Sequence, residues 1–404
     1  MADVRPFRAL RPADHLAARV IAPPYDVLST AEARAIAADP ASFIHITRSE
    51  VGLAEDADPH SDEAYRLART QLDRLRHEGA LVQDTDATFY VYGQKMGDHV
   101  QHGLLAACSV AEYDAGQIRK HEYTRPDKED DRTHHMEVLD AQVGLVFLTY
   151  RAQPSIDRIV GEVIQGEPAW RVHTPDDVEH ALWPVPTSQV AALQGAFTHV
   201  PRMYIADGHH RSAAASRVHA NRGDAASAWF LAGIFPDSAL MVLPYNRVVH
   251  DLHGLTDDAF LAAVDARFHR TPGAPVPADR QQFSMYFGGS WWQLIPRDGL
   301  FDAADPVASL DVSILQDHLL QPILGIDDPR RSTRIDFVGG IRGPEALSAA
   351  VDRGAAVAFH LHPTGLDQLF SVADADAVMP PKSTWFEPKL REGVVVRLLE
   401  GDQG

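Results

Sequence analysis

Short strand-type segments alternate with helical segments along most of the chain, and this alternation restricts the chain to folds that combine sheets with helices. Residues 62–78 carry apolar or aromatic side chains at helical spacing and are followed by Gly79, which predicts a helix that ends there. Residues 88–92 and 103–110 flank Gly97-Asp98-His99, a pattern that predicts a β-hairpin. The sequence therefore predicts an α/β fold with mixed sheets of the α+β kind.

The later part of the chain continues this alternation. The Pro-rich stretch 271–277 predicts a linker or long loop, and residues 212–221 predict a helix rich in small side chains. Residues 283–287 and 291–295 predict a second hairpin around Gly288-Gly289-Ser290. The remaining predicted strands are 145–150, 202–206, 228–235, 240–249, 356–361 and 394–398.

Composition narrows the classes of protein to which the chain can belong. Its 404 residues include 37 Lys and Arg against 56 Asp and Glu, a net charge of −19, and 45% are hydrophobic. A chain of this length can bury a substantial core and predicts two or three folded units. The acidic balance disfavours a protein whose main task is to neutralise a nucleic-acid backbone, since that task needs clustered Lys and Arg.

The single cysteine and the N-terminus bear on the compartment. Cys108 cannot form an intramolecular disulfide, and its apolar neighbours predict a small buried core residue in a reducing compartment. The first residues lack the apolar segment of a signal peptide, and no window reaches the roughly 18 consecutive apolar residues of a membrane span. We therefore expect a cytoplasmic protein with no membrane partner.

The strongest local signal is the junction between the strand predicted at 202–206 and the helix predicted at 212–221. The junction reads Asp207-Gly208-His209-His210-Arg211. A strand that turns directly into a helix presents backbone N–H groups and a partial positive charge to an anion, and a glycine lets that anion approach closely. Arg can bind phosphate oxygens, and His can donate a hydrogen bond without a permanent charge. Asp207 either caps the helix or orients a reacting group.

A second candidate site lies in the most charged stretch, residues 113–142. It begins with Lys120-His121-Glu122-Tyr123-Thr124 and continues through Lys128, Asp131 and Arg132. A glutamate between cations can take a proton from a hydroxyl group while the cations bind the other reactant. The alternative interpretation is a solvated loop and helix.

A third candidate is Lys382-Ser383-Thr384, which follows two prolines and precedes Lys389. These residue types bind phosphate, but the Gly-rich part of a Walker loop is absent. Backbone geometry at a junction between regions is the alternative.

Common metal and dinucleotide motifs are absent from the sequence. It contains no Gly-x-Gly-x-x-Gly, no Cys-x-x-Cys and no His-Glu-x-x-His. The adjacent pairs His134/His135 and His209/His210 make poor chelates because neighbouring residues point in different directions. Among the 21 histidines, we therefore expect functional roles for His121, His209 and His210, and no resident metal site.

Five spaced motifs together resemble a widespread bacterial and archaeal family known as a domain of unknown function. They span nearly the whole chain and are Ala22-Pro23-Pro24-Tyr25-Asp26-Val27, His121-Glu122-x-Thr124 with Asp131-Arg132, Ala206-Asp207-Gly208-His209-His210-Arg211, Pro244-Tyr245-Asn246-Arg247 and Pro380-Pro381-Lys382-Ser383-Thr384.

The Asp-Gly-His-His-Arg segment is also similar to the nucleotide-binding motif of the ParB/sulfiredoxin-like superfamily, in particular its free serine kinases. This resemblance implies a ParB/sulfiredoxin-like core at residues 96–250, with an N-terminal α/β region at 1–95 and a C-terminal α/β region at 251–404. It implies a kinase that transfers phosphate from ATP or ADP, with Mg²⁺, to a small hydroxyl substrate, most simply free L-serine giving O-phosphoserine.

The resemblance also implies roles for individual residues. The catalytic group would comprise Glu122 as base, Asp207 and His210. The nucleotide and phosphate site would comprise Gly208, His209, Arg211, Lys120, Lys382, Ser383 and Thr384. The substrate site would comprise His121, Thr124, Arg132, Asn246 and Arg247.

Other functions stay open at this point. The same junction could sense a nucleotide without turnover, as in a regulatory protein, and the histidines could hold zinc in a hydrolase. DNA binding, found elsewhere in the superfamily, is disfavoured by the charge of −19 and by the absence of a basic recognition helix.

Overall fold

The computed structural model describes residues 1–54 and 56–399, which divide into two units. The first unit contains residues 1–240 and the segment that begins at Pro388, and the second contains Met241–Glu387. The mixed α/β class predicted from the sequence is confirmed. The predicted boundary at 95/96 falls inside a strand of one continuous sheet, and the boundary at 250/251 lies close to the observed break after Leu240.

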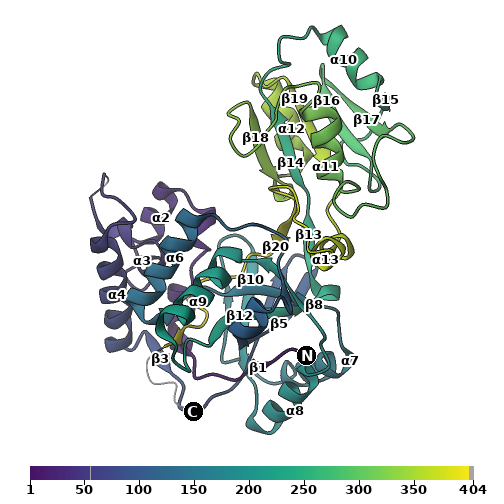
Figure 1. The fold of residues 1–404 in the computed structure, drawn as a ribbon. Coiled ribbons are helices and arrows are strands. Elements are labelled where there is room, and N and C mark those ends of the chain that lie inside the picture. The colour runs from purple at the N-terminus through teal and green to yellow at the C-terminus, as the bar shows by residue number, and fades with distance from the viewer. Residues whose placement is uncertain (55, 400–404) are drawn as a thin grey trace. The chain divides into compact units, whose positions relative to one another are not determined.

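A nine-stranded mixed sheet organises the first unit (Figure 1), in the order β6-β11-β8-β12-β5-β4-β10-β9, with β1 paired to β5. The pairs β6–β11 and β8–β12 are parallel, and the other pairs are antiparallel. Its strands are β1 (Val4–Arg5), β4 (Tyr90–Met96), β5 (His99–Ser109), β6 (Ile118–Arg119), β8 (Val146–Tyr150), β9 (Trp170–His173), β10 (Val178–Pro184), β11 (Met203–Asp207) and β12 (Trp229–Pro236). Two short ladders join β2 (Leu10–Pro12) to β3 (Leu81–Gln83) and β7 (Ala141–Gln142) to β21 (Arg397–Leu398).

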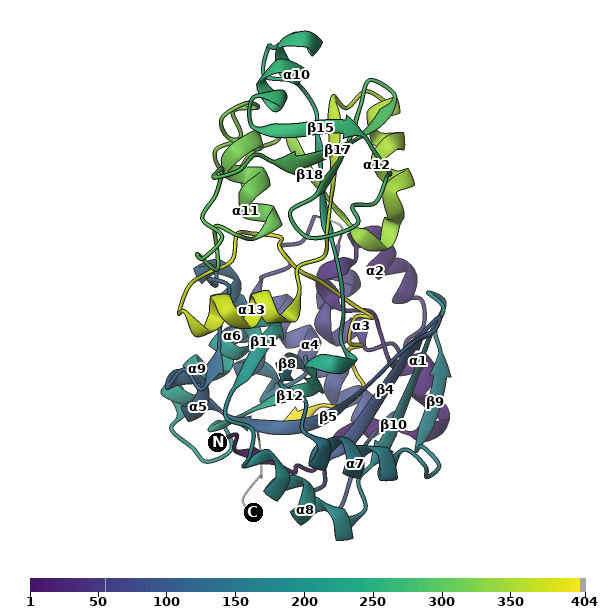
Figure 2. The ribbon, with the colours of Figure 1, turned by 90° about the vertical axis from the view of Figure 1, so that its right-hand side faces the viewer.

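The central strands of this sheet are buried along nearly their whole length, as expected for a sheet covered on both faces. Cys108 in β5 is fully buried, which confirms its predicted place in the core. The predicted hairpin is β4–β5, in which Met96 pairs with His99 and Gly97 has a φ of 57°. Figure 2 shows α7 and α8 lying against each other beside the sheet.

The helices of the first unit are α1 (Ala17–Val20), α2 (Thr30–Ile36), α3 (Ile44–Thr47), α4 (Asp62–His77), α5 (Val110–Asp114), α6 (Pro126–Leu139), α7 (Pro154–Val163), α8 (Thr187–Phe197) and α9 (His209–Arg222), with 3₁₀ turns η1 (Asp14–Leu16), η2 (Tyr25–Val27), η3 (Ser49–Gly52) and η4 (Asp237–Ala239). Helix α4 confirms the prediction at 62–78. Ser61 caps its first turn by accepting a hydrogen bond from the Ala64 N–H, and Tyr65, Leu72 and Leu75 are buried on one face.

Part of the charged stretch 113–142 is buried and not exposed to solvent. Its helix α6 buries Asp131, Thr133 and His135 together with Met136 and Leu139. Buried polar groups need partners, and Asp131 is paired with Arg132. The stretch therefore contributes polar groups to the interior of the first unit.

A six-stranded antiparallel sheet organises the second unit, in the order β15-β17-β16-β19-β14-β18. The predicted strand 240–249 is divided by Pro244, because proline has no N–H to donate. The predicted hairpin at 283–295 is confirmed. The strands are β13 (Met241–Leu243), β14 (Tyr245–Val249), β15 (Phe268–Pro272), β16 (Phe283–Phe287), β17 (Ser290–Pro296), β18 (Ile335–Gly339), β19 (Val357–Leu361) and β20 (Trp385–Glu387), where β13 pairs with β20.

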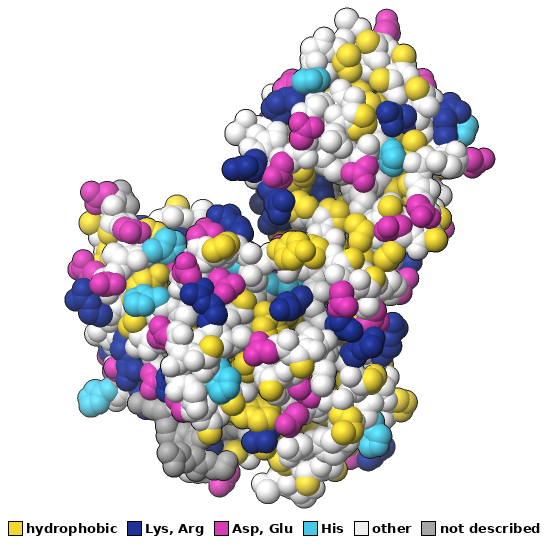
Figure 3. Space-filling view, in the orientation of Figure 1, with side chains coloured by type: hydrophobic (Ala, Val, Ile, Leu, Met, Phe, Trp, Pro, Cys, Tyr) yellow, Lys and Arg dark blue, Asp and Glu magenta, His cyan; other side chains and the backbone are white. Residues whose placement is uncertain are grey.

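Helices cover the second unit as α10 (Asp257–Asp265), α11 (Asp311–Leu315), α12 (Gly343–Asp352) and α13 (Leu366–Asp374), with the π-helical turn η5 (Gln316–Leu320) and the 3₁₀ turn η6 (Gly340–Arg342). None of the helices within residues 1–54 and 56–399 is both long and apolar enough to cross a membrane. On the face shown in Figure 3, Lys and Arg side chains are interspersed with Asp and Glu.

Candidate functional site

The parallel pairing of β6 with β11 creates the candidate site. In this pair Ile118 lies opposite Met203 and Arg119 opposite Tyr204, so both strands end at the same edge of the sheet. The segment 120–122 follows β6, and Gly208 with helix α9 follows β11. Two candidate sites that are far apart in the sequence are thereby brought together.

The turn from β11 into α9 requires glycine at position 208. Gly208 has a φ of 92°, a region that side chains disfavour, and a Cβ there would lie 3.0 Å from Arg211 Nε and 3.3 Å from Val146 Cα. The Gly208 N–H donates to Asp207 Oδ1 over 2.8 Å. The Arg211 and Ser212 N–H groups bond to the Gly208 carbonyl. The N–H groups of the two residues before them lie in the first turn, where a helix has no acceptor for them.

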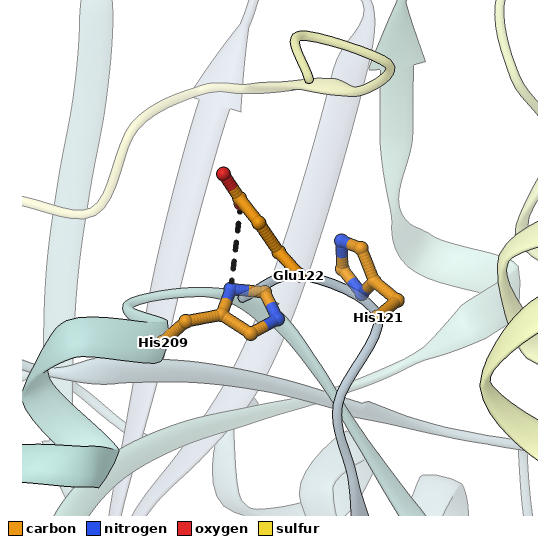
Figure 4. Close-up of side chains that lie close together, drawn as sticks. All are labelled: His121, Glu122 and His209. Carbon is orange, nitrogen blue, oxygen red and sulfur yellow. Dashed lines mark ion pairs between the residues drawn. The ribbon is translucent and has the colours of Figure 1, made fainter. Parts of the chain in front are cut away.

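Side chains from both strand ends form a cluster of His121, Glu122 and His209 (Figure 4). The His121 and His209 rings meet edge to face with centroids 4.6 Å apart. His209 Nδ1 lies 3.8 Å from Glu122 Oε2, and the Glu122 side chain is 53% exposed. Both imidazoles are buried, and His121 Nδ1 and His209 Nε2 have no hydrogen-bond partner among the described residues. The cluster therefore places two unsatisfied ring nitrogens beside a carboxylate that solvent can reach.

Burial keeps both imidazoles neutral. It lowers the pKa of His121 to about 4, against the opposing charge of Asp207. Burial also lowers the pKa of His209 well below its usual value, and the nearby His121 adds to this effect. At neutral pH the contact between His209 and Glu122 is therefore not an ion pair.

Asp207 keeps its negative charge beside this cluster. Burial would raise the pKa of Asp207, but Lys389 and Arg211 outweigh burial and lower it. Arg211 Nη2 lies 3.7 Å from Asp207 Oδ2, and the Arg211 side chain is only 15% exposed. These two cations offset the charge that would otherwise repel an anion at the start of α9.

Three further predicted residues lie on the same segment as Glu122 or at the start of α9. His210 Nε2 accepts a hydrogen bond from the Arg125 N–H over 3.1 Å and so holds this segment to the helix. Thr124 Oγ1 donates to Glu129 Oε2, and Lys120 Nζ lies 4.4 Å from the centroid of the Tyr113 ring. Their predicted roles in catalysis and binding stay predictions.

Of the other predicted ligand residues, Arg132 lies on α6 of the first unit, and the rest belong to the second unit. Arg247 is buried and its guanidinium donates to the carbonyls of Tyr245 and Lys382, which ties β14 to the loop after Pro381. Asn246 Oδ1 accepts from the Leu361 N–H, and Ser383 Oγ donates to the Pro380 carbonyl. These contacts give the motifs at 244–247 and 380–384 a structural role. Ligand binding by their residues, Thr384 among them, stays a prediction.

Residues outside the predicted set also surround Arg211. Tyr25, from the first motif, packs under the Arg132 guanidinium, which lies 4.4 Å from the ring centroid. Glu392 lines the same pocket as Tyr25, Arg132 and Arg211. The first motif pointed to Tyr25, whereas no local pattern marked Glu392.

The ligand atoms that His121, Glu122 and His209 offer indicate which metal ions this cluster could bind. Its three candidate ligand atoms lie within 4.8 Å of one another. Ligands about 2.0–2.2 Å from a zinc ion lie roughly 3.3 Å apart, so these side chains must close in to bind one. Two imidazoles and one carboxylate suit zinc or another transition metal and fit Mg²⁺ poorly, since Mg²⁺ prefers oxygen ligands.

Substitution of Gly208 by alanine tests the geometry of this turn. We expect Gly208→Ala to lower the free energy of unfolding by about 1–2 kcal/mol because of its positive φ, and to weaken anion binding because its Cβ displaces Arg211. Gly223→Ala is the matched control, since Gly223 ends α9 with a φ of 65° but has nothing within 4 Å of the added Cβ. Urea unfolding and nucleotide titration measure the two effects, and equal loss of nucleotide binding in both variants would contradict the assignment.

A known protein family matches most of the chain. The family described as "Protein of unknown function (DUF1015)" matches residues 4–313. No curated protein matches the sequence significantly.

Several solved structures resemble the chain weakly. SbnI with a C-terminal truncation, from Staphylococcus aureus, is 12% identical with a TM-score of 0.42, over 74% of this chain and 90% of that chain. A mutant free serine kinase in complex with AMP is 11% identical with a TM-score of 0.35, over 72% and 89%. A conserved hypothetical protein from Pyrococcus furiosus is 11% identical with a TM-score of 0.36, over 75% and 98%.

Proposed function

The chain belongs to the DUF1015 family, whose description names no activity, and we propose that this member is a phosphotransferase. It transfers a phosphoryl group from ATP or ADP to the hydroxyl group of a small substrate, with free L-serine as acceptor and O-phosphoserine as product. One observation carries the proposal: the Glu122 carboxylate lies beside the N-terminus of α9, where an anion can bind.

The start of α9 supplies the phosphate site. Its unbonded first-turn N–H groups and its partial positive charge attract phosphate oxygens. Arg211 adds a guanidinium that can bind such oxygens in a bidentate manner. Gly208 removes the side chain that would block their approach.

Glu122 supplies the base. Its carboxylate takes the proton of the acceptor hydroxyl, and the acceptor oxygen forms a bond to the terminal phosphorus of the donor. The bond from that phosphorus to the bridging oxygen breaks, and its electron pair stays on the departing nucleotide. The proton remains on Glu122 until solvent removes it. The neutral His121 and His209 suit this reaction because they add no positive charge that would lower the basicity of the carboxylate.

Mg²⁺ would enter with the nucleotide. When bound to the donor's phosphates, it neutralises part of their charge. The donor set of His121, Glu122 and His209 does not fit it, so we assign none of these residues to Mg²⁺. They remain available to hold the proton and to orient the acceptor.

A second candidate function is a zinc-dependent hydrolase. The convergence of His121, Glu122 and His209 favours it, because two imidazoles and a carboxylate are an established zinc ligand set. In that case Glu122 would be a ligand and could not serve as the base. The two functions are therefore mutually exclusive at this cluster.

A screen of donors and acceptors tests the proposal. Purified protein is incubated with Mg²⁺, with ATP, ADP or pyrophosphate, and with a panel of amino acids and polyols, and phosphorylated products are measured by mass spectrometry. We expect O-phosphoserine from serine. No phosphorylated product from any pair would refute the proposal, and nucleotide binding without turnover would favour a regulatory protein.

The metal content of the same purified protein distinguishes the zinc-dependent hydrolase from the phosphotransferase. We expect far less than one zinc per chain by elemental analysis, and transfer activity that survives chelation followed by addition of Mg²⁺. Zinc near one per chain, with activity lost on its removal, would favour the hydrolase.

A further inference from the structure

A pocket of the first unit lies between helix α7 and the strands β5, β8 and β12. Its free volume is about 250 Å³. A cavity of roughly 150 Å³ can hold a benzene molecule, so this pocket has room for a ring that carries a short side chain. All of its lining residues belong to the first unit.

This pocket is separate from the candidate site. Tyr150, the last residue of β8, lines the pocket, whereas Phe147 of the same strand lies opposite Asp207. Three residues of a strand span roughly 10 Å, so the pocket lies toward the other end of β8. None of the three residues that form the candidate cluster lines it.

The interior of the pocket is apolar. Leu104, Ile156 and Ile234 line it and are buried in the core of the first unit. Val100 also lines it and is 46% exposed, so the apolar lining continues to a surface that solvent reaches. Apolar surface of this kind is stabilised when a ligand covers it and removes it from water.

Three polar side chains lie within this apolar lining, namely those of His102, Tyr150 and Asp157. None of the three forms a side-chain hydrogen bond with another described residue. Arg158, which follows Asp157 on α7, donates to Glu162 Oε1 instead. Tyr150 is only 2% exposed, and a buried hydroxyl needs a hydrogen-bond partner, which a ligand in this pocket can supply.

The charge at this pocket is negative. Burial raises the pKa of Asp157, and the neighbouring Asp237 raises it further. Asp237 Oδ1 accepts from the Ala152 N–H over 2.9 Å, which holds its carboxylate near the pocket. His102 adds no opposing charge at neutral pH, because burial and the charge of Arg171 lower its pKa. A cationic group on a ligand would therefore stabilise the ionised Asp157.

We propose that this pocket binds a compact apolar molecule that carries a primary ammonium group. The ammonium group donates to the Asp157 carboxylate, which is exposed, while the apolar body covers Leu104, Ile156 and Ile234. The Tyr150 hydroxyl supplies a further hydrogen bond to the ligand. The inference is independent of the proposed phosphotransferase, because the two sites share no residue.

A ligand-detected NMR titration of the full chain tests this pocket with three probes. They are 2-phenylethylamine, 2-phenylethanol, which lacks the charge, and ethylamine, which lacks the ring. We expect 2-phenylethylamine to bind about 5- to 20-fold more tightly than 2-phenylethanol, since Asp157 is a partly solvated carboxylate. It should bind at least about 10-fold more tightly than ethylamine, because the ring buries apolar area.

A glycine of α7 allows the pocket to be filled. Gly161 lines the pocket, and nothing lies within 4 Å of a Cβ added to it. We expect Gly161→Leu to weaken 2-phenylethylamine binding by at least about 10-fold, because the leucine side chain takes the space of the ring. Gly195→Leu on α8 is the matched control, since a Cβ there also has nothing within 4 Å and Gly195 does not line the pocket.

Two further variants assign the polar contacts. We expect Asp157→Asn to weaken 2-phenylethylamine binding by about 5- to 20-fold while 2-phenylethanol binding stays nearly constant. Glu162→Gln, at an exposed ion pair on the same helix, should change neither affinity. Tyr150→Phe should weaken the binding of both ring compounds by a few-fold, since both can bond to the phenol hydroxyl.

Three results would overturn the inference. The first is that 2-phenylethylamine does not bind, and the second is that it binds no more tightly than 2-phenylethanol. The third is that Gly161→Leu and Gly195→Leu retain equal affinity for it, which would place the amine elsewhere on the chain. Amine binding that only Gly161→Leu and the polar variants weaken would support the site, whether or not any phosphorylated product is found.

Discussion

Glutamine at position 122 is expected to lower the rate of phosphoryl transfer by about 10²- to 10⁴-fold, the usual contribution of a positioned general base. Glu122→Gln keeps the size of the side chain and its place beside His209, but an amide cannot take the proton of the acceptor hydroxyl. Because the proposed phosphate site belongs to α9, the affinity for nucleotide should stay within a few-fold of the wild-type value. Single-turnover kinetics and nucleotide titration measure the two quantities.

The exposed Glu137 on α6 offers a control, since its carboxylate accepts from Asn221 and lies outside the cluster. Glu137→Gln should leave the rate unchanged. A Glu122→Gln variant that transfers phosphate at the wild-type rate would remove the base assignment. A variant that loses nucleotide binding instead would place Glu122 in the donor site.

Removal of the Arg211 guanidinium is expected to have the second large effect, which is on the affinity for nucleotide. We expect Arg211→Met to weaken nucleotide binding by about 10- to 100-fold, because a charge-assisted hydrogen bond to phosphate contributes roughly 1.5–3 kcal/mol. The substitution also leaves Asp207 with less positive charge beside it, so the corner repels an anion more strongly. The measurement is nucleotide titration without acceptor, because Arg211 also lines a neighbouring pocket with Tyr25, Arg132 and Glu392.

Arg211→Lys separates charge from geometry, since lysine keeps the charge but cannot bind phosphate in a bidentate manner. It should recover part of the lost affinity. Arg158→Met, at a surface ion pair on α7, should change nothing. If Arg211→Met and Arg158→Met bind nucleotide equally well, the phosphate site lies elsewhere.

Local patterns predicted much of the fold. Helix α4, the β4–β5 hairpin and the turn from β11 into α9 all follow from side-chain periodicity and from glycine at positions where φ is positive. Division of the strand at Pro244 also has a local cause, because proline lacks an N–H. Periodicity does not report strand order, so the continuous sheet across residue 95 and the return of the chain at Pro388 to the first unit were not predicted.

The residue types of the site were visible in the sequence, but their distances were not. Glu122 and His209 are both polar residues at the end of a strand, and either alone is compatible with an ordinary capped or solvated segment. The parallel pairing of β6 with β11 places them at one edge of the sheet. Burial then makes His121 and His209 neutral, and this burial cannot be predicted from the spacing of residues along the chain.

The sequence by itself predicted the corner at Asp207-Gly208 that we propose as the anion site, because a strand that passes through Asp-Gly into a helix leaves N–H groups without an acceptor. Only the tertiary structure decided what surrounds that corner. One pocket is lined by Tyr25, Arg132, Arg211 and Glu392, although Tyr25 and Glu392 lie near opposite ends of the sequence. Burial of the Glu392 carboxyl raises its pKa to about 7, and such a desolvated group has no signature in local sequence.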